Sequence, residues 1–170
     1  GILLDVDPQR LRRRGRAEPA VRLEPYVNDR PYAASSFLSV AISRVLGSAL
    51  QGKCDARPEL VDTEMPLTAR LSAVPCREGR EFLEGLFRPL GYDVAAEQHA
   101  LDAEFPEWGD SHYCTVELSK TTRLRDLLAH LYVLVPVLDD TKHYWVSEDE
   151  IEKLQRHAGD WLTDHPSRDG

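Results

Sequence analysis

One group of residues comes closest to a catalytic or metal-binding set: Asp139, Asp140, Lys142 and His143. Two carboxylates and a nearby imidazole can hold a hard divalent cation, or act as general acid and base in a small metal-dependent hydrolase. The spacing is unspecific, because adjacent acidic residues after a helix also cap turns or stay solvated. Tyr144 and Trp145 follow directly, and a loop of mixed charge and aromatic area has the composition of protein-interface hot spots. We therefore favour partner binding for this loop.

No other pattern predicts an enzyme. The ten glycines form neither a dinucleotide fingerprint nor a phosphate loop, and G-x-S-x-G and H-E-x-x-H are both missing from the sequence. The three cysteines, Cys54, Cys76 and Cys114, are odd in number and far apart, which predicts reduced thiols rather than disulfides or a zinc site. His130 stands among leucines and is predicted to be a core or boundary residue.

The net charge of −8 disfavours nucleic-acid binding by the whole surface, so any RNA contact must be local. One segment is densely basic, with Arg10, Arg12, Arg13, Arg14, Arg16 and Arg22. Gly15 and Pro19 argue against regular structure there. The segment is either a solvated loop or a loop that follows the phosphates of an RNA.

Two further segments combine turn residues with aromatic and charged ones. The first, YVNDRPY, supplies Tyr26, Asn28, Asp29, Arg30 and Tyr32 as candidates for partner binding. The second, FPEWGDS, is a turn that presents Glu107, Trp108 and Asp110. An aromatic residue in such a turn either fills the local core or meets a partner, and the sequence leaves both possibilities open.

Hydrophobic periodicity predicts the elements that carry these segments. Strands are expected over residues 2–6, 67–73, 92–101 and 113–119. Helices are expected from Ser35 or Ser36 to Leu50, from about Glu78 to Leu90, from Leu124 to a kink or end near Val135, and from Ser147 onward. The order of elements predicts a single α+β domain, with a mostly antiparallel sheet covered by about four helices. At 170 residues, without a membrane-spanning run or a signal peptide, the chain is expected to be cytoplasmic.

Three phrases carry a resemblance to a known family: YVNDRPYAASSFLSVA, FPEWGDS and HLYVLVPVLDDTKHYWVSEDEIEKL. In this order and at about these separations they resemble the amino-terminal region of bacterial Hen-type proteins, the RNA 3′-terminal ribose 2′-O-methyltransferases of RNA repair. The resemblance runs from Ile2 to about His165. It implies the ligase-associating region, which binds the bacterial polynucleotide kinase-phosphatase-ligase Pnkp and activates its RNA ligase.

The resemblance also implies how the chain is organised. Residues 1–165 would be the ligase-associating domain, lacking its first elements, and residues 166–170 would begin a linker to a methyltransferase domain. S-adenosylmethionine and a divalent metal are then expected only in that further domain, and no catalytic residue or metal ligand is expected in this chain. The alternative is an RNA-positioning module that uses the basic segment Arg10–Arg22.

Overall fold

The computed structural model of the chain describes residues 3, 32–138, 159–162 and 164–166. Its centre is a sheet of three strands in the order β1-β3-β2, with β1 at Met65–Pro75, β2 at Asp93–Ala100 and β3 at Asp110–Thr122. Both pairings are antiparallel. The α+β class is therefore confirmed, with a wholly antiparallel sheet in the described part of the chain.

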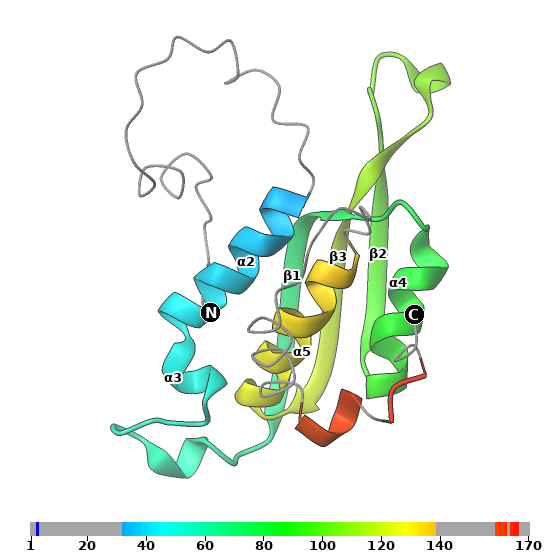
Figure 1. The fold of residues 1–170 in the computed structure, drawn as a ribbon. Coiled ribbons are helices and arrows are strands. Elements are labelled where there is room, and N and C mark those ends of the chain that lie inside the picture. Colours follow the sequence, from blue (N-terminus) through cyan, green and yellow to red (C-terminus); the bar gives the residue numbers. More distant parts are fainter. Residues whose placement is uncertain (1–2, 4–31, 139–158, 163, 167–170) are drawn as a thin grey trace, which may run out of the picture.

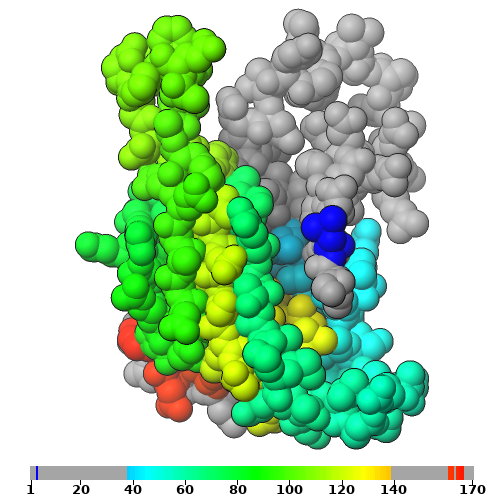
Figure 2. Space-filling view, turned by 180° about the vertical axis from the view of Figure 1, so that it is seen from behind, coloured from blue at the N-terminus to red at the C-terminus, as the bar shows by residue number. Residues whose placement is uncertain are grey.

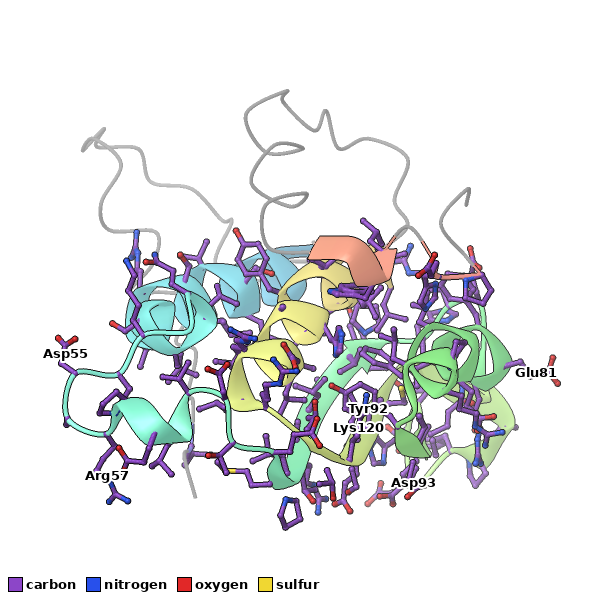
Figure 3. The ribbon with its side chains drawn as sticks, turned by 90° about the horizontal axis from the view of Figure 1, so that it is seen from below. Asp55, Arg57, Glu81, Tyr92, Asp93 and Lys120 are labelled. Carbon is purple, nitrogen blue, oxygen red and sulfur yellow. The ribbon has the colours of Figure 1, made fainter. Side chains whose placement is uncertain are left out.

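The described helices lie on one face of this sheet. They are α2 (Tyr32–Val45), α3 (Gly47–Leu50), α4 (Arg80–Phe87) and α5 (Leu124–Val137). Helix α5 crosses the sheet, α4 lies beside it over β2, and α2 and α3 pack on α5 (Figures 1 and 3). No described helix covers the opposite face, so the expectation of a sheet covered by helices is only partly met.

The core forms between the helical layer and the central strand. In β3, Cys114, Val116 and Leu118 are almost fully buried, as their alternation predicts. The helices supply the other side, with Leu83, Leu86 and Phe87 from α4, Ile42 from α2, and Leu127, Leu128, Leu131, Leu134 and Val135 from α5. This apolar layer packs the sheet against the helices. The β2–β3 connection lies outside this layer.

Strand β1 contains a β-bulge. Leu71 pairs with Val116 and Val74 pairs with Cys114, so one additional residue is accommodated on β1 between the two pairs. The bulge includes Ala73, which has a φ of 55°, a backbone angle that residues other than glycine rarely adopt. The alternation of LTARLSAV predicts a regular strand and gives no sign of this bulge.

The helix boundaries differ from the predicted ones in several places, and α2 begins at Tyr32 rather than at Ser35 or Ser36. The predicted helix to Leu50 is divided at Leu46, whose φ of −115° and ψ of 19° are not helical. It ends as expected before Gly52, which has a φ of 66°. Helix α5 continues past Pro136 to Val137, because a proline near the end of a helix removes only one backbone hydrogen bond. Among the described residues, no helix is long and apolar enough to cross a membrane.

Candidate interaction surface

The β2–β3 hairpin extends beyond the helices as a projecting arm (Figure 1). We define the arm tip as residues 101–109, which join the paired residues Ala100 and Asp110. The backbone N–H of Leu101 donates to Gly109 O at 2.9 Å, so the pairing continues into the tip. Figure 2 shows the same projection from behind, clear of the helical body. The arm therefore presents its tip to other molecules from several sides.

The tip is an ordered turn that its own sequence specifies. Pro106 begins a 3-10 helix, Pro106–Trp108, because its ring fixes φ near the helical value. The Asp102 side chain accepts a hydrogen bond from the Glu104 backbone N–H at 2.7 Å, and the Trp108 N–H donates to Phe105 O at 3.0 Å. Gly109 closes the turn with a φ of 84°, a value that favours glycine.

Two aromatic rings stand at the tip in solvent. The rings of Phe105 and Trp108 are stacked, with centroids 4.8 Å apart and planes 14° apart. Phe105 is 43% exposed and Trp108 is 58% exposed, so the stack belongs to no core. Large exposed aromatic side chains held in a fixed geometry are typical anchors of protein interfaces. Of the two possibilities that the sequence left open for Trp108, the structure thus rules out core packing.

The predicted contact residues are only partly described. Glu107 and Asp110 are exposed beside Trp108 on the arm. Tyr32 is the first residue of α2, and its side chain lies outside the described residues. The same holds for the whole of three predicted sets: Tyr26, Asn28, Asp29 and Arg30; Asp139, Asp140, Lys142, His143, Tyr144 and Trp145; and the arginines of the basic segment.

The most chemically suggestive side chains of the described part are buried together. The Tyr92 hydroxyl lies 2.8 Å from His130 Nδ1, and the Trp161 ring packs edge-on against His130 at 4.6 Å. His165 Nε2 lies 2.8 Å from Leu86 O, and Lys120 lies over the Tyr92 ring (Figure 3). The sequence predicted a core position for His130 but none of its partners, because they come from distant segments with no common motif.

Burial decides the protonation of this cluster. It lowers the pKa of His130 to about 4, and Lys120 and His165 add to the effect. Burial, helped by Asp126, also holds the pKa of Tyr92 well above its ordinary value, so the phenol keeps its proton and donates to the neutral imidazole. His130 is 4% exposed. Held by the Tyr92 hydroxyl and shielded from solvent, the imidazole is a structural group of the core.

The thiols and carboxylates of the described part form no reactive centre either. Cys76 and Cys114 are buried, and burial together with the neighbouring Cys76 raises the pKa of Cys114 to about 12. All three cysteines are free thiols, as predicted. In the described ranges, no group of three or more histidine, cysteine, aspartate or glutamate side chains could hold a metal ion.

These features are those of a small α+β binding domain that presents an aromatic-tipped hairpin. A comparison with models of protein families matches the whole chain, residues 1–170, to the family described as "RNA repair, ligase-Pnkp-associating, region of Hen1". The chain belongs to this family. The resemblance carried by the three sequence phrases is thereby confirmed. A search of curated proteins found no match to the chain.

Proposed function

We propose that this chain is a non-catalytic module that binds Pnkp and activates its RNA ligase during RNA repair. The family description supports association with the ligase Pnkp, and the arm supplies a surface suited to it. The observation that carries the proposal is the solvent-exposed Phe105–Trp108 stack on an ordered turn. Tyr26–Tyr32 and Asp139–Trp145 are proposed as further contacts, and the catalytic methyltransferase chemistry is assigned to a domain after residue 165.

Activation needs no chemistry from this module. If the ligase exchanges between an active and an inactive conformation, a module that binds the active one more tightly raises its population. The rigid tip suits this role, because a pre-ordered aromatic pair loses little conformational entropy when it docks. Binding and activation are then one event and should saturate together.

The proposal predicts that Trp108→Ala weakens binding to Pnkp. We expect a loss of about 30-fold in affinity, which corresponds to the 2 kcal/mol that defines an interface hot spot. Calorimetry with purified Pnkp measures the affinity, and adenylylation of the ligase measures activation. Excess Trp108→Ala protein should restore adenylylation, because the substitution weakens docking without changing which ligase conformation is favoured.

Leu60→Ala is the matched control. Leu60 is also an exposed apolar side chain, at 39%, but it lies in a different element, Pro58–Leu60. It should bind and activate like the unaltered chain. The proposed function would be refuted if the unaltered chain neither bound Pnkp nor raised the adenylylation of the ligase.

A further inference from the structure

The negative charge of this protein is concentrated in one hairpin. The segment from Asp93 to Glu117 contains seven carboxylates, Asp93, Glu97, Asp102, Glu104, Glu107, Asp110 and Glu117, and neither lysine nor arginine. The whole chain has 29 acidic and 21 basic residues and a net charge of −8. This segment therefore carries −7 of that charge; with Lys120 near the end of β3 the whole β2–β3 hairpin carries −6, and the rest of the chain carries −2.

These carboxylates have no cationic partners in the part of the chain that the structure describes. The salt bridges found there join Glu59, Glu84, Asp62 and Asp126 to arginines, and none involves a carboxylate of the hairpin. Even Glu117, which stands opposite Arg70 in the register, forms no salt bridge with it. Within the described residues, the carboxylates of the hairpin are thus not neutralised by an ion pair.

The hairpin also carries the sheet face that no described helix covers. Register places Glu97 opposite Thr115 and Ala95 opposite Glu117, and Ala95, Glu97 and Glu117 are exposed. The small side chain of Ala95 leaves a hollow on either side. One hollow, of about 350 Å³, is bordered by Asp93, Glu117 and Arg88, and the other, of about 210 Å³, by Glu97, Glu117 and Arg70.

We infer that this open face and the arm tip form one continuous docking surface for a lysine- and arginine-rich surface of a protein partner. The inference rests on the proposed function, in which the partner is the ligase. Cationic side chains of the partner would pair with the exposed Asp93, Glu97 and Glu117 beside Ala95, and the Phe105–Trp108 stack would anchor the far end of the contact. Opposite charges of this kind steer association and fix its orientation.

The chemistry of the partner supports this choice. An enzyme that joins RNA strands must offer lysine and arginine side chains to phosphates, so a cationic surface is expected on a ligase. RNA itself is disfavoured as the occupant, because the hairpin and the phosphate backbone have charges of the same sign. Small cations are disfavoured as the occupant too. They would bind through charge alone and would not use the apolar aromatic stack.

The test compares two double variants with equal charge change. Asp93→Lys/Glu97→Lys alters the open face, where the opposite residues Ser119 and Thr115 are neutral. Asp55→Lys/Glu64→Lys alters exposed positions outside the hairpin, and Asp55 lies far from Asp93 (Figure 3). Each variant raises the net charge by four, so general attraction between the two proteins changes equally.

We expect the open-face variant to lose at least about 10-fold in affinity for Pnkp at 50 mM salt, mainly through slower association. The control variant should lose less than about 3-fold, and the difference should shrink at 500 mM salt because salt screens the charges. Thermal unfolding of both variants verifies that each is folded.

The outcomes separate the two proposals. If the unaltered chain binds Pnkp and both double variants bind equally well, the docking surface is refuted while the proposed function stands. The affinity of the open-face variant for RNA oligonucleotides is also compared with its affinity for Pnkp. If the two affinities are equal, the added positive charge acts on any charged partner alike, and the inference fails. If the unaltered chain does not bind Pnkp, the proposed function fails and the inference fails with it.

Discussion

At the scale of single residues, the stability of the protein should respond to the buried His130. Its imidazole is neutral in the folded state, with a pKa lowered to about 4 from 6.5. An unfolded chain exposes the same group with an ordinary pKa near 6.5. Between these two values the unfolded state binds more protons than the folded one. Folding therefore becomes less favourable as the pH falls through this window.

We predict that the free energy of unfolding decreases between pH 6.5 and pH 4 by up to about 3 kcal/mol on account of His130. The double variant His130→Phe/Tyr92→Phe replaces the hydrogen-bonded pair by two apolar rings and should remove this part of the pH dependence. Urea unfolding at several pH values measures it. Replacing the exposed His99 by Gln is the control, and it should retain the dependence of the unaltered chain.

A double variant that loses as much stability in acid as the unaltered chain would contradict the assignment to His130.

At the scale of elements, Pro136 is linked to a polar contact between α2 and α5. A proline in a helix cannot donate to the carbonyl four residues earlier, which here is Tyr132 O. Ser39 Oγ, from α2, donates to that oxygen at 3.3 Å. The neighbouring helix thus replaces a donor that the proline removes. The sequence identified the proline and predicted a kink or end near Val135, but it gave no sign of a donor almost a hundred residues away.

This contact predicts an energetic coupling between the two positions. Ser39→Ala should lower the free energy of unfolding by about 1 kcal/mol. In the background of Pro136→Ala, which supplies a backbone N–H to Tyr132 O, the same substitution should cost clearly less. Urea denaturation of the four proteins of this cycle measures the coupling. Ser43→Ala, at an exposed position of α2, is the control and should cost little in both backgrounds. Equal costs of Ser39→Ala in the two backgrounds would disprove the coupling.

At the scale of the whole molecule, the core and the proposed binding surface lie in different parts. The core lies between β3 and the helices, whereas the arm tip contributes exposed side chains and closes on the paired residues Ala100 and Asp110. Replacing residues 101–109 by Asn-Gly, the preferred sequence of a two-residue hairpin turn, should therefore shorten the arm without disturbing the sheet.

We predict that this shortened chain unfolds within a few degrees of the unaltered one and no longer activates the ligase. Differential scanning calorimetry and the adenylylation assay measure the two properties separately. A large fall in the unfolding temperature would show instead that the tip stabilises the fold.

The sequence predicted the parts of this fold that depend on periodic burial. Leu67, Ala69 and Leu71 alternate with polar residues because one side of β1 faces the core, and the leucines of α5 recur at helical spacing for the same reason. The open sheet face was not predicted, since alternation shows that one side is buried and does not show what lies over the other. Whether Trp108 lies in the core or in solvent could not be predicted either, because a turn has no periodic pattern of burial.

The bulge at Ala73 has a consequence for how the protein behaves in concentrated solution. Strand β1 is an outer strand, and an outer strand is a template on which a second copy can pair and aggregate. The irregular step between Leu71 and Val74 interrupts the run of backbone groups, and Pro66 and Pro75 lack the N–H that pairing requires. A second copy of the chain is thus hindered from pairing along the β1 edge of the sheet.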